Sequence, residues 1–588
     1  MSEPDAAPGA PARRLTDLYL DDTDDAAALH PAERRLLACA ANGEVCKIGT
    51  DRPAKKTAEN LIRSTFLRFL ALGGDDDAPV HPRGIQLRGA WIECRPIGRL
   101  EKVLDLNGVM LPSLLVLRNC FIDGAVDLRD ATARTLNFGG SDIGGLYGDR
   151  LKISGGLFLR KDFTTDGEVR LIGAEIGGDL SLRDATLTGT EHCILAQRCR
   201  VASDIILDGG FSAAGTVDLS GAEIIGSLRC GGGTFSGSNQ SLNANRIDVG
   251  GDVDLGKQFS AAGPVRLVGA RIAGDLSCTN AAFDGSPSLD IDRSRIGGTF
   301  YWRGISSARG PLDLEAAAIR AISFDSASWT LPECVVLDDL VYEGFSGDLK
   351  NGNARFWRDW LARQPERHRT EEFKPKPFEQ LAGVLSAMGY EEEARAVRIE
   401  RRRQQTRFMT RHEPWPTSPA GRIMRMLSIL WQHVIGFLIS YGYRPGNAVL
   451  YILLIWLSGA GLYHHAALQG VMTPTHPLIF KETRDGGLIP EACADNWVHF
   501  PPGIAATCAD AVPSEYSGFQ PLLYSADVVL PIINLRQEID WAPRIVHPDG
   551  SDWPLGRLVR AWEWFQIIAG WMLSLLFVSA IGGVIRRE

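Results

Sequence analysis

The chain has 588 residues, of which 45% are hydrophobic and 23% are charged, and its formal net charge is −9. This composition is typical of a globular protein, and the negative charge gives no general basis for binding nucleic acid. Residues 1–30 are rich in Ala, Pro and Asp and lack the apolar core of a signal peptide, so we expect the large N-terminal portion to stay in the cytoplasm.

The start of the chain predicts a tail followed by helices. Residues 1–30 contain the run Asp-Asp-Thr-Asp-Asp and predict a disordered acidic tail. Residues 31–41 and 53–72 have the apolar spacing of helices, and we predict that 31–79 form a helical N-terminal cap. Such a cap would cover the exposed strand edge at the start of the stacked array that the following residues predict. The alternative is a small helical module that binds a partner.

A repeat organises the part of the chain that follows. Its clearest copies span 167–176, 215–224 and 263–272, and weaker copies start at Gly124 and Gly310. A second phase, Leu-x6-Ile/Val, lies near the middle of each repeat, so that one unit of about 48 residues holds two coils of about 24 residues each. A fixed period of this kind indicates a stacked array.

The repeat also predicts the kind of array. Apolar residues come in short alternating pairs separated by Gly and Asp, which is the pattern of very short strands. We predict a mainly β fold over 80–348, a right-handed parallel β-helix of about ten coils. Leu182, Cys230 and Cys278 hold the same position in successive repeats and should point into one stacked column. The many Asp residues of the repeats are interpreted as solvated turn residues.

The repeat is followed by helical sequence. Residues 356–364, 377–389 and 391–409 have helical patterns, and we predict an αα-hairpin and a basic juxtamembrane helix within 349–411. A single hairpin is too small to form a peptide groove, so we interpret it as a C-terminal cap or spacer, with a partner site as the alternative.

Nine arginines cluster before the most apolar part of the chain. A run of this kind is often only a solvated helix face, but here it precedes membrane-like sequence, which favours contact with an anionic cytoplasmic leaflet. No aromatic residues alternate with them, so a nucleic-acid site is disfavoured. The predicted membrane-surface residues are Arg395, Arg398, Arg401, Arg402, Arg403, Arg407, Arg411, Arg422 and Arg425.

The C-terminal third predicts two membrane spans. Residues 447–468 and 564–585 are long enough to cross a bilayer, whereas the apolar stretch within 412–446 is too short and suits an interfacial segment. Gly459 and Gly461 predict close helix packing in the first span. Arginines flank the outer ends of the pair, so the positive-inside rule places both termini in the cytoplasm and 469–562 outside.

The external loop contains two further candidate features. Cys493 and Cys508 would lie in an oxidising compartment, and we predict a disulfide between them. Residues 519–535 form an apolar stretch with the length of a re-entrant or interfacial segment. The re-entrant candidates are Tyr524, Ser525, Asp527 and Pro531. The order span, re-entrant segment, span is that of a channel, but no selectivity-filter sequence follows.

The sequence contains no recognisable catalytic motif. No GxGxxG follows a strand, and P-loop, GxSxG and HExxH motifs are missing. The nine cysteines from Cys39 to Cys334 lack metal-site spacing and are interpreted as buried thiols. We therefore assign no catalytic, cofactor-binding or metal-binding residue and expect no cofactor.

The chain resembles a family of bacterial membrane proteins that have a pentapeptide-like β-helical region and a two-span C-terminus. The residues that carry this resemblance are the repeats themselves and the segments 66–74, 81–92, 377–397 and 519–535. The resemblance implies an inner-membrane location and this architecture. Members are often labelled membrane-associated oxidoreductases, so a redox activity is suggested by the family label alone. The resemblance supplies no catalytic residue.

Three functions follow as hypotheses. The first is a non-enzymatic scaffold or recognition protein of the bacterial inner membrane, which binds an unknown protein on the cytoplasmic face and anionic lipids beneath it. The second is the oxidoreductase that the family label implies. The third is a two-span channel or sensor that uses 519–535. Homo-oligomers through the transmembrane helices are compatible with all three, and nucleic acid is not expected as a partner.

Overall fold

The computed structural model describes seven segments of the chain: 29–97, 100–189, 191–346, 353–412, 417–475, 517–546 and 551–582. Its contacts divide the protein into two compact units, Met1–Arg398 and Ile399–Glu588. Each unit is described by itself.

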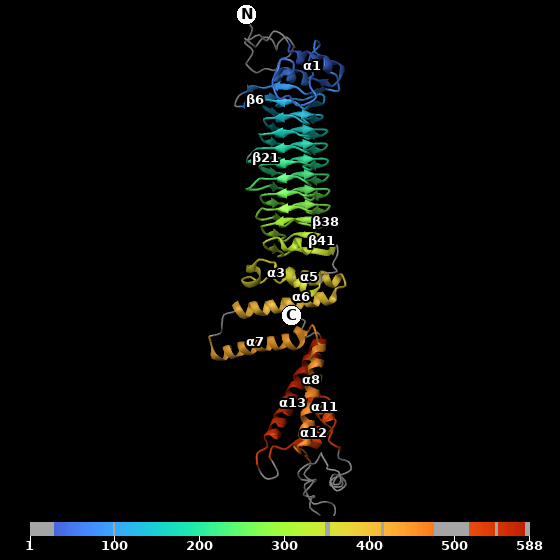
Figure 1. The fold of residues 1–588 in the computed structure, drawn as a ribbon, viewed down its shortest axis with the longest axis vertical. Coiled ribbons are helices and arrows are strands. Elements are labelled where there is room, and N and C mark those ends of the chain that lie inside the picture. Colours follow the sequence, from blue (N-terminus) through green and yellow to red (C-terminus); the bar gives the residue numbers. More distant parts are fainter. Residues whose placement is uncertain are drawn as a thin grey trace, which may run out of the picture. The chain divides into compact units, whose positions relative to one another are not determined.

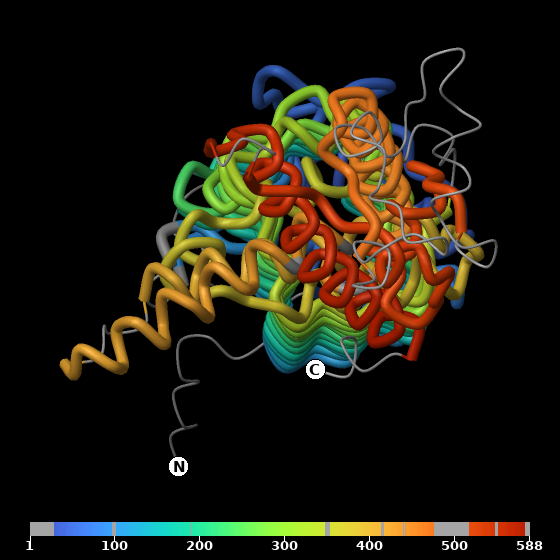
Figure 2. The backbone as a smooth tube through the Cα atoms, turned by 90° about the horizontal axis from the view of Figure 1, so that it is seen from below, coloured from blue at the N-terminus to red at the C-terminus, as the bar shows by residue number. Residues whose placement is uncertain are grey.

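The first unit is a parallel β-solenoid of about 11 turns, which confirms the predicted β-helical repeat region (Figure 1). A representative coil has four short strands: β14 (Lys152–Ile153), β15 (Leu157–Phe158), β16 (Thr164–Thr165) and β17 (Val169–Arg170). Strands equivalent to β14 and β15 form sheet A, those equivalent to β16 form sheet B, and those equivalent to β17 form sheet C. Seen along the stack, successive coils overlay one another closely (Figure 2).

The repeat consists of two unequal coils. The residue directly before the second sheet A strand occupies an equivalent position in every coil. In successive coils this residue is Asp179, Asp204, Ser227, Asp252 and Asp275. The separations between neighbours in this series are 25, 23, 25 and 23 positions. Between residues 152 and 275 the two coils of about 24 residues therefore alternate between a long coil and a short coil. The last coils, which start at 271, 295 and 318, have 24, 23 and 23 residues.

The positions of aromatic side chains alternate together with the coil lengths. Phe211 precedes its sheet B strand, whereas Phe235 of the next coil lies within its strand. Phe259 and Phe283 repeat this alternation, and the ring centroids of successive rings are 5.2, 5.0 and 5.6 Å apart. Each Phe stands beside a small residue of the neighbouring coil, so the interior volume per coil is kept nearly constant. The small residues are Ala213, Gly233, Ala261 and Ala281.

The predicted core column is confirmed. The strands that precede Leu182, Cys230 and Cys278 are in register through the intervening coils, and all three side chains are fully buried. The glycines that start the repeat are required by close approach of the coils. A Cβ atom on Gly167 would lie 2.1 Å from the carbonyl oxygen of Gly144, and one on Gly263 would lie 2.2 Å from that of Gly237.

Helices adjoin both ends of the stack. At the start, α1 (Pro31–Asn42) and α2 (Ser64–Ala71) pack on the first strands, and Glu33 of α1 is fully buried. Its carboxylate accepts hydrogen bonds from the Arg63 side chain, where Nη2 lies 2.7 Å from Oε2 and Nε lies 2.9 Å from Oε1. After the last coil come α3 (Ala354–Ala362), α4 (Glu366–Thr370), α5 (Lys376–Ala387) and α6 (Glu391–His412). The boundary between the two units falls within α6.

The second unit is a helical bundle. Its helices are α7 (Pro419–Ile439), α8 (Gly446–Leu468), α11 (Pro521–Val529), α12 (Gln537–Asp540) and α13 (Pro554–Ile581), and β44 (Met472–Pro474) pairs antiparallel with β45 (Trp541–Pro543). Helices α8 and α13 are long and apolar enough to cross a bilayer, and only 22% and 33% of their most apolar windows are buried inside the protein. Figure 1 shows α11 beside this pair.

Two helices differ in extent from the sequence prediction. The predicted second span begins at residue 564, but α13 starts at Pro554, so nearly three additional turns, which contain Arg557, Arg560 and Glu563, precede it. The short apolar segment expected within 412–446 is the later part of α7, a helix of 21 residues that starts with polar sequence containing Arg422 and Arg425. Length alone therefore does not separate α7 from a span; its two arginines do.

Candidate functional site

Helices α8, α11 and α13 meet at a group of polar side chains in an otherwise apolar bundle. Glu563 is 4% exposed and the other four members are fully buried. Buried polar groups in a membrane segment are costly and for that reason often mark a function. We call this group the polar core; it consists of Tyr463, Tyr524, Ser525, Glu563 and Gln566.

Gln566 is the centre of the polar core. Its Oε1 accepts a hydrogen bond from the Tyr463 hydroxyl at 2.7 Å, and its Nε2 donates to Ser525 Oγ at 3.0 Å and to the carbonyl of Ile455 at 3.1 Å. Ser525 in turn donates to the carbonyl of Trp456 at 2.7 Å. One amide therefore connects all three helices.

Small residues allow these helices to approach. A Cβ atom on Gly459 would lie 2.2 Å from Gln566 Nε2 and 2.6 Å from Ser525 Oγ, and one on Gly570 would lie 2.1 Å from the carbonyl oxygen of Val529. The close packing predicted for the first span is thus found at Gly459. It is not found at Gly461, where a Cβ atom would meet nothing within 4 Å.

Glu563 is the charged member of the polar core, and both of its oxygens have partners. The Tyr524 hydroxyl donates to Oε1 at 3.0 Å, and Arg560 Nη1 lies 3.1 Å from Oε2. Arg560 also donates through Nη2 to the carbonyl of Pro543 at 3.0 Å. This ion pair compensates the burial of the carboxylate and links α13 to the strand β45.

Of the four re-entrant candidates, the structure brings Tyr524 and Ser525 into the polar core. Asp527 lies beside it and closes the following loop, because its carboxylate accepts hydrogen bonds from the backbone N–H groups of Leu535 at 2.6 Å and Glu538 at 2.9 Å. Pro531 lies within that closed loop, outside the polar core.

Sequence reasoning missed Tyr463, Glu563 and Gln566. Two of them have a readable signal, since a carboxylate and an amide at the start of an apolar helix are uncommon in membrane segments. The predicted span begins one residue after Glu563 and so leaves it out. The contact of Tyr463 with Gln566 joins residues that are 103 positions apart and has no local signature.

The chemistry of the polar core is that of a satisfied network. Each hydroxyl and the amide nitrogen have acceptors within the protein, so the network holds α11 against both long helices. In the part of the chain that the structure describes, no group of three or more His, Cys, Asp or Glu side chains is placed to hold a metal ion.

The predicted basic residues lie on two helices, seven on α6 and two on α7. Three are paired on their own helix: Arg395 with Glu392 at 2.8 Å, Arg398 with Glu391 at 3.9 Å, and Arg403 with Glu400 at 3.9 Å. Arg403, Arg407 and Arg411 are exposed at a spacing of four residues, which places them along one face of α6. Arg422 is exposed, and Arg401, Arg402 and Arg425 are half-buried.

The cysteines of the first unit behave as core residues. The nine from Cys39 to Cys334 are free thiols; seven are buried, and Cys39 and Cys334 are half-buried. Burial raises the pKa of the Cys120 and Cys199 thiols to about 12, so both are protonated at neutral pH and poor nucleophiles. Cys493 and Cys508 lie outside the described residues, so the predicted disulfide stays a prediction.

A groove of about 490 Å³ runs along sheet A of the solenoid. One wall is a ladder of charges that alternate in sign, in which Lys152 Nζ lies 3.6 Å from Glu175 Oε1 and Arg200 Nε lies 2.8 Å from Glu223 Oε2. Successive rungs come from successive coils, which are about 4.8 Å apart. We call this feature the sheet A groove.

An isoleucine stands at one end of the sheet A groove. The residue after each strand along the groove is small in three coils (Ser154, Gly177 and Ala202), and it is Ile225 in the fourth. Ile225 is 71% exposed, and among the described residues from 115 to 320 it is the only large apolar side chain that is exposed.

Comparison of the chain with protein family models, with curated proteins and with solved structures found no match. The family resemblance, and the redox activity that the family label suggests, therefore stay predictions from the sequence.

Proposed function

We propose that the protein is a non-enzymatic, membrane-anchored recognition scaffold whose solenoid binds a protein partner along the sheet A groove. The observation that carries this proposal is Ile225, which is exposed next to the alternating charges of Arg200 and Glu223. Burying it under a partner would remove an apolar side chain from water, and the charge ladder would set the register and exclude partners with the wrong sign.

Site-specific photo-crosslinking in cells tests the proposal. A crosslinking residue at position 202, inside the sheet A groove, should yield a discrete adduct. The matched control is position 273, which is exposed in the same column of the solenoid two coils beyond Ile225. Ile225→Asp should reduce the adduct at position 202 at least five-fold without changing the melting temperature. Equal adducts at 202 and 273, or no effect of Ile225→Asp, would contradict the proposal.

The anchor in this proposal is the pair α8 and α13 in the bacterial inner membrane, with both termini and a right-handed, helix-capped solenoid in the cytoplasm. Support comes from Arg422, Arg425 and Arg444 before the first helix and Arg586 and Arg587 after the second. The exposed row Arg403, Arg407 and Arg411 would then contact anionic lipid. Reporter fusions at residue 500 and at the C-terminus should report outside and inside; the reverse result would place the groove outside the cell.

A second candidate function is sensing by the outer part of the bundle. The observation that favours it is the polar core, through which α11 is hydrogen-bonded to both long helices, so that a displacement of α11 would be transmitted to both. In this case Gln566→Leu should change the response to an external cue while leaving the crosslink at position 202 intact. Loss of both would indicate only that the bundle had unfolded.

A further inference from the structure

The solenoid ends in an open strand edge. Its last strand, β43 (Val341–Ser346), pairs with β41 (Ala318–Phe324) of the previous coil. On the other side of β43, no strand of the described chain is paired with it. In an inner coil this side is occupied: the carbonyl of Leu151 accepts from Glu175 N at 2.8 Å and that of Ile153 accepts from Gly177 N at 2.7 Å.

Leu340 and Tyr342 are the equivalents of Leu151 and Ile153 in the terminal coil, because Val341 donates to Ala317 just as Lys152 donates to Ala131. The Tyr342 carbonyl accepts from the side-chain Nε2 of Gln380 at 2.6 Å. A glutamine amide is chemically a peptide group, so Gln380 takes the place of the backbone N–H of an additional coil. The Leu340 carbonyl accepts no hydrogen bond from a described residue.

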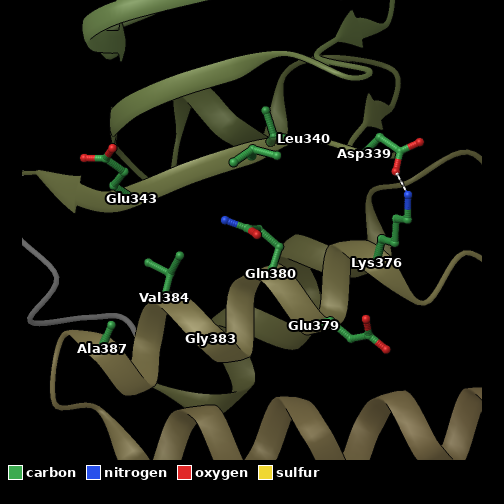
Figure 3. A pocket seen from close by; sticks show the side chains of 10 residues that line it. Asp339, Leu340, Glu343, Lys376, Glu379, Gln380, Gly383, Val384 and Ala387 are labelled. Carbon is green, nitrogen blue, oxygen red and sulfur yellow. Dashed lines mark hydrogen bonds and ion pairs between the residues drawn. The ribbon is translucent and has the colours of Figure 1, made fainter.

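A cleft of about 530 Å³ lies between this edge and α5 (Figure 3). Gln380 and Val384 of α5 point across it toward the strand. Gly383 lies in the same wall, and a Cβ atom there would meet nothing within 4 Å, so the cleft is open at that point. The volume is that of an ordinary ligand site, and four residues of extended chain, about 13 Å long, would run along it.

The cleft is acidic. Its lining contains three carboxylates, Asp339, Glu343 and Glu379, and a single cation, Lys376, which is hydrogen-bonded to Asp339. The Asp339–Lys376 pair is neutral and the Glu379 carboxylate points away from the strand (Figure 3), so the negative charge next to the strand edge is that of Glu343. Glu343 is exposed on the strand side. An occupant with lysine or arginine side chains would complement this charge, whereas an acidic one would be repelled.

We propose that this cleft binds an extended, basic peptide segment of another protein, which adds to β43 as the strand of one further coil. The segment runs parallel to β43 and donates a backbone N–H to the Leu340 carbonyl. It replaces Gln380 at the Tyr342 carbonyl, and a basic side chain lies toward Glu343. Main-chain pairing supplies affinity and the carboxylate of Glu343 supplies selectivity. The site is separate from the sheet A groove and does not depend on it.

The test uses the full-length, detergent-solubilised protein and a fluorescein-labelled hexapeptide of alternating Lys and Val. Fluorescence anisotropy should show saturable binding, at least ten-fold tighter than for the matching Glu-Val hexapeptide. A Lys-Val peptide with N-methylated backbone amides should lose at least ten-fold in affinity, because it cannot donate to the strand edge. Hydrogen exchange at residues 340–346 should slow when the peptide binds.

Gly383→Leu is the informative variant. It fills the open part of the cleft, and because leucine is a better helix former than glycine it should not weaken α5. We expect it to reduce binding at least ten-fold, whereas Ala362→Leu, an exposed helical position in α3 outside the cleft, should leave binding unchanged. Equal binding by both variants, no preference for the basic peptide, or self-association through this edge in place of peptide binding would overturn the proposal.

Discussion

A glutamine inside an apolar bundle costs free energy unless its amide finds partners within the protein. Gln566 finds three of them, on two other helices. The same principle applies to Glu563, whose two oxygens are satisfied by Tyr524 and Arg560. These side chains therefore specify how α11 sits between the long helices, which apolar contacts alone leave poorly determined.

Gln566→Leu should destabilise the bundle by about 1–2 kcal/mol, because the Tyr463 and Ser525 hydroxyls lose a partner while remaining buried. The measurement is the thermal midpoint of the detergent-solubilised protein, followed by tryptophan fluorescence. Ser458→Ala is the control, since Ser458 is exposed and its hydroxyl donates to Ile455 of its own helix. Equal midpoints for the two variants would mean that the polar core contributes little to packing.

Asp290 predicts a pH effect in the solenoid. Burial raises the pKa of Asp290, which is paired in register with Asp313 of the next coil, where burial also raises the pKa. A carboxyl with a raised folded pKa contributes stability below its unfolded pKa, and this contribution is lost as the pH rises through the folded pKa. Asp290→Asn should therefore raise the free energy of unfolding at pH 7, by up to about 0.5 kcal/mol.

The Asp290→Asn gain should vanish below about pH 3, where both states of the wild-type carboxyl are protonated. Thermal unfolding followed by circular dichroism between pH 3 and pH 8 measures the difference. Asp248→Asn, at an exposed position, is the matched control for the removal of one negative charge from the solenoid. A gain that persisted at pH 3 would show that the effect was not electrostatic.

At the scale of elements, short strands and long helices differ in how well the sequence reveals them. Most strands of the solenoid are only two or three residues long, yet their repetition in every coil makes the architecture predictable. The apolar part of helix α13 is predicted, but the helical residues before 564 are not, because hydropathy marks the apolar stretch and carries no information on where a helix begins. Consequently, only Tyr524 and Ser525 of the polar core could be predicted from the sequence.

A buried ion pair between Glu33 and Arg63 attaches helix α1 to the first coil, and breaking it should loosen this end of the solenoid. Glu33→Gln leaves the Arg63 guanidinium buried opposite a neutral amide, and should destabilise α1 locally by about 3 kcal/mol. Hydrogen exchange should then accelerate in 31–42 and in β2 (Leu61–Arg63) while the middle coils stay protected. The double variant Glu33→Leu, Arg63→Met should recover most of the protection; failure to do so would point to a role beyond charge pairing.

At the scale of the whole molecule, the repeat predicts a stack of coils but does not predict that long and short coils alternate within it. The period of the repeat can be read from the sequence, whereas its division into a long and a short coil becomes apparent only once the strands are aligned. The alternation is accompanied by an exchange of large and small side chains between neighbouring coils, as in Phe211 with Ala213 and Gly233 with Phe235. That exchange is a property of contacts between coils, and no single coil contains it.

Because long and short coils alternate, deleting two coils and deleting one coil should affect stability differently. Removing residues 200–247 excises one full repeat and joins a long coil to a short coil, so the alternation is preserved. Removing 200–222 excises a single short coil and places Leu187 directly beside Phe235, with Ala185 beside Gly233. The first variant should remain folded, while the second should lose about 2–4 kcal/mol through overpacking at one position and a cavity at the other.

Thermal unfolding and expression level of the two deletion variants measure this difference. A deletion of one coil that proved as stable as the deletion of two would contradict this expectation. The variant without residues 200–247 also lacks Ile225, so it should keep its fold but no longer bind the partner proposed for the sheet A groove.

The alternation has a consequence for how such a chain can change over evolutionary time. If a single coil can be neither gained nor lost without disrupting the core, the heritable unit is the pair of coils. The solenoid then lengthens or shortens in quanta of about 9.6 Å, twice the spacing between coils. A duplication that adds one pair extends the surface but leaves the order of charges and the two ends unchanged. The length of the solenoid and the binding properties of its surface and ends can therefore vary separately.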